Sequence, residues 1–546
     1  MQETLIVNAR VHTMSPRGTL RGAAVALRDG RVLGVGDELS VRSLLGRSVL
    51  RVDAQGGSVI PGFTDCHIHF TAFAQRTEQV TLEGAGGLAE VLERVRAKAA
   101  DLAPGEWVVG GGYDRNLWPA SDRPTAQALD QAVPDRPVAL ASKDGHQVWV
   151  NTLALERAGF LSGLPDPAGG VVERDEAGRP TGVLKERAAD RIWQVVQDPD
   201  LPTLRRMAAR AQQRLHALGV TGIHVPEGPT AFRLFQEMAT SGDLALRVCM
   251  MLPADRLQAA ADLGIEGGFG SSLLRVGPVK IFADGSLGSQ TAALLDPYQG
   301  READGYRGVV VTEADELEDL VARATQAGLA AAIHAIGDRA NRMALDALEP
   351  WLFHSRRRGL RHRIEHAQLV DPRDRPRFGQ LGVIASMQPV HGPQDRTLVT
   401  RHWGAERAGH AYAWRSLREA GARLAFGSDA PVESPDPLLG LHAAMTRRLP
   451  GEAWEPEEDE RSRERLTLQE ALEAYTLGAA FASGEEAAKG SIEPGKLADV
   501  VILSHDLAQL PLEAWEELHV RGTFWDGRVV YRSQDLPVEM DVRVGS

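Results

Sequence analysis

The feature that most restricts the fold is a repeated alternation of apolar, strand-like segments with helix-like segments through the middle of the chain. The apolar segments are Val220–Pro226, Leu246–Leu252, Leu274–Ala283, Leu329–Ala335, His362–Gln368, Val383–Pro389 and Arg423–Ser428. Helical patterns lie between most of them, for example Glu313–Ala327 and Asp338–Leu348. Repeated strand–helix order predicts an α/β fold with a parallel sheet. If that sheet closes into a barrel, the polar residues that end most strands lie where barrels carry their chemistry.

Both ends of the chain have a different, β-rich character. Short apolar runs broken by turn residues fill residues 1–60, and a strand at 498–503 precedes a hairpin around Asp526-Gly527. We expect residues 1–60 and 490–546 to form one small sheet domain, because chain ends often lie close together. Residues 61–489 then form the main domain. The stretch of about 72–200 does not follow the alternation and is interpreted as an insertion after the first barrel strand, such as a lid.

Composition excludes several classes of protein. The chain has 546 residues, 43% hydrophobic and 25% charged, which allows a large soluble core. A formal charge of −13 argues against binding to nucleic acid, because phosphate would be repelled. Two cysteines do not make a disulfide framework, and no apolar run reaches the ~20 residues that a membrane span needs. The N-terminus is typical of a strand rather than a signal peptide, so we expect a cytoplasmic protein, with a homo-oligomer left open.

Two histidines follow the first apolar segment of the main domain, in the motif PGFTDCHIH. Alternate side chains of a strand share one face, so His67 and His69 are expected to point the same way and to reach one cation. An HxH pair is common on its own and is often structural. Its position directly after an apolar run and a Pro-Gly makes a metal site the better interpretation.

Further polar residues end later strands. His334 and His366 each lie at the end of a predicted strand, and either one alone is more often structural than a ligand. Asp429 follows the last segment, where an isolated aspartate is usually a turn former or a helix cap. Together with the HxH pair, however, these residues indicate one metal site, with Asp429 as a ligand and general base.

Lys280 lies inside an otherwise apolar strand in the motif VKIFADGSLGS. A buried ammonium is costly unless it is paired, so one interpretation is a salt bridge, for example to Asp284. The other is that CO₂ adds to the neutral amine and gives a carbamate, an anionic ligand that can bridge two cations.

The order HxH, Lys, His, His, Asp resembles the amidohydrolase superfamily. The motifs PGFTDCHIHF, VKIFADGSLGS, IHAIGDRA, RIEHAQ, FGSDAPVESPDP and PGKLADVVIL are similar to amidohydrolase family 3, the group of N-substituted formamide deformylase-like metal-dependent hydrolases. The resemblance covers nearly the whole chain. It implies a (β/α)8 TIM barrel with a composite β-sandwich built from both termini. It also implies metal-ligand roles for His67, His69, Lys280, His334, His366 and Asp429.

The motif SKDGHQVWVN in the insertion also matches this subgroup and places His146 over the site as a substrate contact or oxyanion donor, against an ordinary loop histidine. The resemblance implies one or two divalent metal ions, with zinc first, since imidazole and carboxylate suit it. We expect hydrolysis of a non-peptide carbon–nitrogen bond in a small-molecule amide, formamide or cyclic amide. A metal-activated hydroxide attacks and Asp429 accepts the proton. Glu365 and Asp338 are expected to orient nearby groups.

Three other functions are considered. The same site could act on esters or phosphotriesters, or as a ring deaminase, although a deaminase usually manages with one metal and does not need Lys280. A non-catalytic barrel is disfavoured because all six ligand types are present. Substrate specificity is expected to lie in the insertion and in the loops 113–118, 287–298, 388–394 and 431–437. The residues Trp118, Tyr298, Met387 and Trp403 are candidates for an apolar substrate side.

Overall fold

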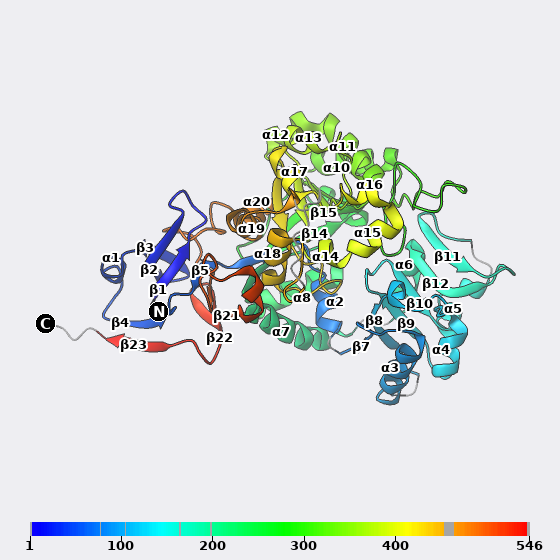
Figure 1. The fold of residues 1–546 in the computed structure, drawn as a ribbon, viewed down its shortest axis with the longest axis horizontal. Coiled ribbons are helices and arrows are strands. Elements are labelled where there is room, and N and C mark those ends of the chain that lie inside the picture. Colours follow the sequence, from blue (N-terminus) through cyan, green and yellow to red (C-terminus); the bar gives the residue numbers. More distant parts are fainter. Residues whose placement is uncertain are drawn as a thin grey trace.

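The computed structural model describes residues 3–76, 78–103, 105–162, 165–196, 199–452 and 463–542. The chain forms three sheets that follow one another along the long axis of the molecule (Figure 1). A sheet that contains both chain ends lies at one end, a barrel lies in the middle, and the insertion lies at the other end.

The middle sheet has eight parallel strands, and it confirms the predicted (β/α)8 barrel. In sheet order the strands are β19 (Arg423–Phe426), β18 (Ile384–Met387), β17 (Arg363–His366), β16 (Ala331–Ala335), β15 (Leu274–Phe282), β14 (Arg247–Pro253), β13 (Val220–Val225) and β6 (Phe63–Asp65). The edge strands β6 and β19 meet just past β6, where the backbone N–H of Cys66 donates to the carbonyl of Phe426 at 3.0 Å. The seven apolar segments of the sequence therefore all become barrel strands.

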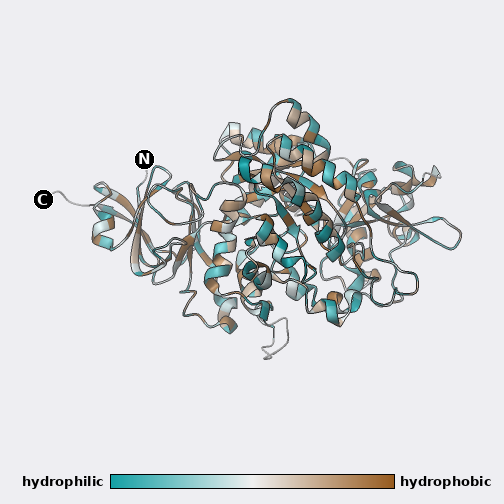
Figure 2. Ribbon diagram, turned by 90° about the horizontal axis from the view of Figure 1, so that it is seen from above, coloured by the Kyte–Doolittle hydropathy of each residue, from teal (hydrophilic) through white to brown (hydrophobic). Residues whose placement is uncertain are grey.

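Most of the barrel strands are rich in apolar residues because both of their faces are covered. Every residue of β13 and β16 is buried, as expected for parallel strands packed between a barrel interior and a ring of helices. Figure 2 shows apolar residues on the central strands and polar residues on the outer sides of the surrounding helices. The helices that cover or follow the barrel strands are α2 (Phe70–Arg76), α7 (Leu201–Ala217), α8 (Pro229–Ser241), α9 (Leu257–Asp262), α10 (Ala314–Gln326), α11 (Asp338–Leu348), α12 (Leu352–Arg358), α13 (Arg375–Leu381), α14 (His391–Gln394), α15 (Arg396–Trp403), α16 (Ala405–Ala408), α17 (Trp414–Glu419), α18 (Pro437–Thr446), α19 (Leu468–Tyr475) and α20 (Leu477–Ala482).

The terminal sheet combines strands from both ends of the chain. Its strands are β1 (Thr4–His12), β2 (Thr19–Arg28), β3 (Arg31–Gly36), β4 (Ser48–Asp53), β5 (Ser58–Pro61), β20 (Val500–Leu503), β21 (Val520–Trp525), β22 (Arg528–Arg532) and β23 (Val538–Val542), with helix α1 (Glu38–Arg42). Strand β5 pairs with β1 on one side and with β20 on the other, which joins the two ends of the chain. The division of the chain into separate domains stays a prediction.

The insertion differs from the sequence expectation, because it contains a six-stranded sheet of its own. Its strands are β7 (Val80–Thr81), β8 (Val108–Tyr113), β9 (Val138–Ser142), β10 (Gln147–Val150), β11 (Gly170–Arg174) and β12 (Pro180–Glu186), with helices α3 (Leu88–Ala100), α4 (Ala126–Ala132), α5 (Thr152–Arg157) and α6 (Arg187–Trp193). The glycines of β8 permit a close approach, since a Cβ at Gly110 would lie 2.4 Å from the Val80 carbonyl oxygen. A glycine-rich strand of this kind gives no clear alternation in the sequence.

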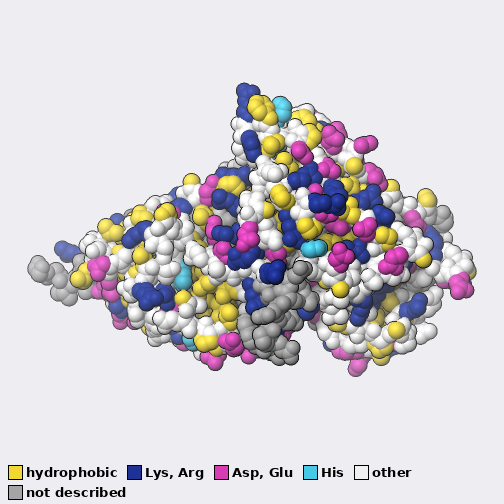
Figure 3. All heavy atoms as spheres, turned by 45° about the horizontal axis from the view of Figure 1, so that its top comes forward, with side chains coloured by type: hydrophobic (Ala, Val, Ile, Leu, Met, Phe, Trp, Pro, Cys, Tyr) yellow, Lys and Arg dark blue, Asp and Glu magenta, His cyan; other side chains and the backbone are white. Residues whose placement is uncertain are grey.

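The outer surface carries charges of both signs. On the face seen in Figure 3, Lys and Arg side chains are interspersed with Asp and Glu, without one extended basic patch. Among the described residues, no helix combines the length and the apolar character that crossing a bilayer requires.

Candidate metal and active site

The predicted site residues lie at the carboxyl ends of the barrel strands. Strand β6 ends at Asp65, so the HxH pair lies in the loop after the strand, and strand alternation does not orient it as expected. Instead, Asp65 Oδ1 accepts the backbone N–H groups of His67 at 3.1 Å and of Ser428 at 3.0 Å. This carboxylate joins the loops that carry the first and the last candidate ligands.

Asp429 lies at the centre of the cluster. Its Oδ1 is 3.4 Å from His69 Nε2 and 3.6 Å from His67 Nε2, and its Oδ2 is 3.9 Å from His366 Nδ1. Asp429 and His366 both have left-handed backbone, with φ of 62° and 72°. Non-glycine residues adopt such conformations mostly where the surrounding structure imposes them, and they concentrate at functional sites.

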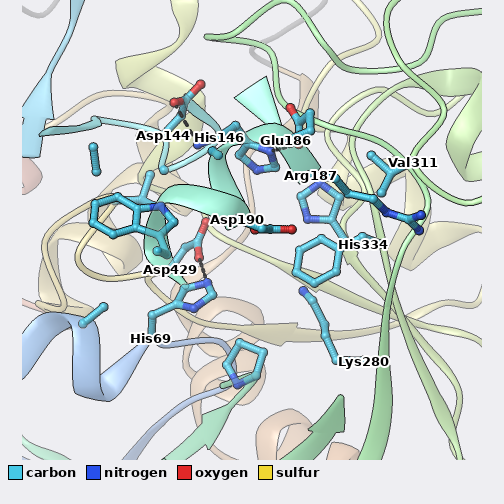
Figure 4. A pocket seen from close by; sticks show the side chains of 18 of the residues that line it. His69, Asp144, His146, Glu186, Arg187, Asp190, Lys280, Val311, His334 and Asp429 are labelled. Atoms are coloured by element: carbon cyan, nitrogen blue, oxygen red, sulfur yellow. Dashed lines mark hydrogen bonds and ion pairs between the residues drawn. The ribbon is translucent and has the colours of Figure 1, made fainter. Parts of the chain in front are cut away.

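The remaining two predicted ligands border the same cluster. Lys280 Nζ is 3.5 Å from His67 Nε2, and the ring centres of His334 and His366 are 4.5 Å apart. Figure 4 shows Lys280 and His334 facing the same pocket as the His69–Asp429 pair. All six predicted residues are therefore together, although His334 lies at the edge, and its Nε2 is 3.7 Å from Asp284.

Three imidazoles each have one nitrogen occupied by an acceptor of the protein. His67 Nδ1 donates to Glu365 at 2.5 Å, and His366 Nδ1 donates to the amide oxygen of Gln388 at 2.9 Å. His334 Nε2 donates to the carbonyl of Gly285 at 3.2 Å. The second nitrogen of each ring keeps its lone pair, which is the tautomer that a metal ligand needs.

A charged network inside the barrel supports His67. Arg363 is fully buried and bonds the carboxylate of Glu365, and it also donates to the carbonyl of Cys66 at 2.7 Å and to Ser386 at 2.6 Å. Its Nη1 lies 2.9 Å from His224 Nδ1, which ties in β13. The expectation that Glu365 orients a neighbouring group is confirmed. Arg363, in the same motif, was missed by the sequence analysis.

The pKa values of the cluster residues are shifted by burial and by their neighbours. Burial lowers the pKa of His67 to about 4 and that of Lys280 to about 8. Burial opposes ionisation of Asp429, but the hydrogen bond with His69 and the adjacent imidazoles hold its pKa well below the usual value. At neutral pH the imidazole of His67 is therefore neutral and Asp429 is ionised.

Lys280 does not form the salt bridge that the sequence left open. Asp284 Oδ2 accepts the backbone N–H groups of Ala293 and Gly337, both at 2.8 Å, so this carboxylate is used elsewhere. Among the described residues, no carboxylate forms an ion pair with Lys280, whose Nζ lies 4.7 Å from the centre of the Phe282 ring. The amine is buried without a counter-charge in direct contact.

Asp338 was expected to orient a group at the site, and this expectation is wrong. It is the first residue of α11, and its Oδ1 accepts the backbone N–H of Leu295 at 2.8 Å. It therefore stabilises the start of a helix and a loop. Asp284, four residues after Lys280, is the carboxylate that borders His334.

His146 reaches the pocket from the insertion, on the side opposite Lys280 (Figure 4). Its ring lies 5.2 Å from that of His334, and its Nδ1 is 2.9 Å from Glu186 Oε2 at the end of β12. Burial opposes the charged form, but Glu186 outweighs it and raises the pKa of His146 to about 9. Nε2 is left to face the pocket as a donor.

The loop after β15 fixes this part of the insertion. Asp144 Oδ2 accepts the hydroxyls of Ser286 at 2.6 Å and Ser289 at 2.7 Å, and Asp144 Oδ1 accepts the backbone N–H of His146 at 3.3 Å. The hydroxyl of Thr291 donates to Glu186 at 2.5 Å. The GSLGS and SKDGH motifs therefore act as a pair, and the barrel positions His146.

Two cavities meet at the cluster. The outer cavity has a volume of about 900 Å³ and runs between barrel and insertion, past Arg76, Arg187, Trp193 and Phe282. The inner cavity has a volume of about 80 Å³. The residues expected to form an apolar substrate side do not line either cavity, because Trp118, Tyr298, Met387 and Trp403 are buried in apolar clusters.

His391 is a site residue that the sequence analysis missed. Its Nε2 is 4.0 Å from Asp429 Oδ2, and its ring lies close to His366 and Asp429. Its Nδ1 accepts the amide N–H of Gln368, so Nε2 carries the proton and is a donor rather than a metal ligand. It follows β18, so the rule that found His334 and His366 would also have found it. Glu186 had no comparable signal, because it lies in the insertion.

Comparisons with known proteins agree with this geometry. A model of the Amidohydrolase family matches residues 51–531. The protein LONG AFTER FAR-RED 3 of Arabidopsis thaliana is 33% identical, over 97% of this chain and 91% of its own length. The N-substituted formamide deformylase of Arthrobacter pascens is 29% identical, over 97% and 98%. A solved structure of an uncharacterized metal-dependent hydrolase from Pyrococcus horikoshii OT3 has a TM-score of 0.76 at 28% identity, over 95% of this chain and 100% of its own.

Proposed function

Because the chain belongs to the amidohydrolase family and is a hydrolase, we propose that it cleaves a non-peptide carbon–nitrogen bond in a small-molecule amide, formamide or cyclic amide. The observation that carries this proposal is the convergence of His67, His69, His366 and Asp429 at one point of the barrel mouth. A relative of similar length is named for deformylation of N-substituted formamides, which is chemistry of this class.

The donor set fits a divalent ion. The imidazoles of His67, His334 and His366 each have one nitrogen held by the protein and the other free. The ionised carboxylate of Asp429 lies near His67 and His366. Imidazole and carboxylate together suit zinc, with manganese, iron, cobalt or nickel as substitutes. His67, His69, His334, His366 and Asp429 would hold one or two such ions.

We assign Lys280 to the same site as a carbamate. CO₂ adds to the neutral amine, which forms an N–C bond and releases one proton. The product is an anion. Its formation avoids the cost of burying a charged amine that has no counter-charge in contact. A carbamate reaches further than the amine, and it would help to hold one or two ions in the cluster.

Asp429 and His146 then have different roles: Asp429 transfers a proton, and His146 donates a hydrogen bond. A bound divalent ion would supply Lewis-acid chemistry here, lowering the pKa of water and polarising a carbonyl oxygen. Asp429 accepts the proton of the attacking water, and it returns this proton to the departing nitrogen. His146, oriented by Glu186, donates from Nε2 to the oxyanion of the tetrahedral intermediate.

A substrate panel tests the proposal. Enzyme loaded with zinc is offered N-formyl amines, N-acyl amines, cyclic amides, and esters and phosphotriesters of matched size. We expect release of amine from at least one carbon–nitrogen substrate, loss of that activity with a chelator, and its return with zinc. Turnover of the esters or phosphotriesters alone would favour the second chemistry for this site. Metal-loaded enzyme that is inactive on the whole panel would contradict the proposal.

The support of His67 gives a further prediction. Changing Glu365 to Gln removes the negative charge that accepts from His67 Nδ1 and that forms the ion pair with Arg363. Loss of such a partner usually lowers metal affinity or activity by about 10- to 100-fold. Competition titration with a chelator measures the change. The matched variant Glu318→Gln, on the exposed side of α10, should bind metal as the unaltered protein does. Equal affinities in both variants would contradict the role of Glu365.

A further inference from the structure

The two cavities differ in volume and would hold different parts of one substrate, a large part and a small part. Both are lined by His146, His334, His366 and Asp429, so the cluster lies where they join. On the proposed function, the scissile bond lies at this junction and its two substituents extend in opposite directions. The outer cavity, about 900 Å³, takes the larger substituent, and the inner cavity, about 80 Å³, takes the smaller.

Several residues that line the inner cavity carry a buried polar atom without a hydrogen-bond partner. Among the residues that the structure describes, four such atoms belong to residues that line this cavity: Tyr113 Oη, Gln147 Oε1, Gln368 Oε1 and His391 Nε2. Their residues are at most 5% exposed. Buried polar groups in proteins are nearly always hydrogen-bonded, so four in one small space indicate a place for a polar group.

The four atoms differ in whether they donate or accept hydrogen bonds. The amide oxygens of Gln147 and Gln368 accept hydrogen bonds only. The amide N–H of Gln368 donates to His391 Nδ1 at 3.1 Å, so His391 carries its proton on Nε2 and donates from there. The hydroxyl of Tyr113 does both. A ligand group that donates and also accepts would satisfy this set.

The charge of the lining disfavours an anion. Lys143 is paired with Glu433 at 2.7 Å, and Arg115 with Glu173 at 3.3 Å. The carboxylates of Asp114, Asp144 and Asp395 also line the inner cavity. A carboxylate on the substrate would therefore meet an excess of like charge, because all three cations of the lining, Lys143, Arg115 and His146, are already paired with carboxylates.

The volume limits the size of the group. A cavity of about 150 Å³ accommodates benzene, so about 80 Å³ accommodates roughly three or four non-hydrogen atoms. We propose that the inner cavity is a specificity subsite for a short, uncharged hydroxyl- or carboxamide-bearing substituent of the substrate. Tyr113, Gln147, Gln368 and His391 are its recognising residues.

Isosteric substrates test the subsite. N-benzylglycolamide and N-benzylpropionamide differ by a hydroxyl in place of a methyl on the acyl side, and N-benzylmalonamate carries a carboxylate there. N-(2-hydroxyethyl)benzamide and N-propylbenzamide make the same comparison on the amine side. We expect kcat/KM to favour the hydroxyl compound at least fivefold in one of the two pairs, and the malonamate to be poorest in its series. A ratio below fivefold in both pairs would overturn the inference.

A second measurement separates this inference from the proposed function. The dissociation constants of the same five compounds are measured by calorimetry with the metal-loaded enzyme, so no turnover is required. A fivefold preference in binding without hydrolysis would support the subsite and contradict the hydrolase assignment. Hydrolysis without any preference in binding or in kcat/KM would support the hydrolase and overturn the subsite.

Two variants then assign the residues. Tyr113→Phe removes one oxygen, and Gln147→Leu removes an acceptor of similar size. We expect each variant to lower the ratio of kcat/KM for the hydroxyl substrate to that for the alkyl substrate at least threefold. Damage to the fold would lower kcat/KM equally for both substrates. Gln213→Leu, on the exposed face of α7, is the matched control and should keep the ratio. An unchanged ratio in both subsite variants would contradict their assignment.

Discussion

Changing Asp429 to Asn is expected to abolish most turnover while the metal stays bound. The carboxylate lies within 3.4 Å of His69 Nε2 and 3.6 Å of His67 Nε2, so an amide oxygen in its place can still face the ion. An amide cannot accept the proton of the attacking water. Loss of a general base typically costs about 100- to 10,000-fold. We therefore expect kcat to fall within that range.

The measurement pairs steady-state kinetics with elemental analysis of the same preparation. Asp315→Asn, on the exposed side of α10, is the matched control and should keep full activity. Full activity in the Asp429 variant would remove this residue as the base. Loss of metal together with activity would show a ligand role without separating the two functions, and the pH dependence of residual kcat in metal-saturated variant then decides between them.

Changing Lys280 to Ala is expected to lower metal content and to reduce activity by more than about 100-fold, since loss of even an outer partner of a ligand costs about 10- to 100-fold. The amine is buried beside His67, and no carboxylate of the described residues forms an ion pair with it. Its removal takes away the carbamate that would help to hold one or two ions. Short carboxylic acids, such as acetate or propionate, fit the space left by the side chain and should restore part of the activity.

Lys98→Ala, in the insertion helix α3, is the control for the Lys280 variant and should keep both metal and activity. Elemental analysis gives the metal stoichiometry, and carbon-13 NMR of enzyme prepared with labelled bicarbonate detects the carbamate directly. An unchanged metal content in the Lys280 variant, with no carbamate signal in the unaltered enzyme, would contradict carboxylation.

The barrel could be predicted because its strands are buried on both faces. Segments such as Leu246–Leu252 and Leu329–Ala335 are largely apolar, and they became β14 and β16 with small shifts of their ends. The insertion could not, because a strand such as β8 contains glycines that let Val80 approach. The insertion's sheet forms by pairing of strands that are distant in the sequence, and local sequence patterns do not reveal such pairing.

The candidate ligands were found because they follow strands or match motifs, but the reasons for their orientation were not visible. The loop of His67 is held by Asp65, and the charge that fixes the ring of His67 comes from Glu365, 298 residues away. Arg363 was passed over, because a buried arginine has no sequence signature until its partners are known. His391 was passed over although it follows a strand.

The proposed hydrolysis requires a divalent ion held among His67, His69, His334, His366 and Asp429. X-ray diffraction from crystals of the metal-loaded enzyme, recorded above and below the zinc absorption edge, tests this directly. We predict an anomalous peak at about 2.0–2.2 Å from imidazole nitrogens of the cluster and from an oxygen of Asp429. A crystal whose zinc peaks all lie elsewhere, with these side chains ligating nothing, would contradict the account.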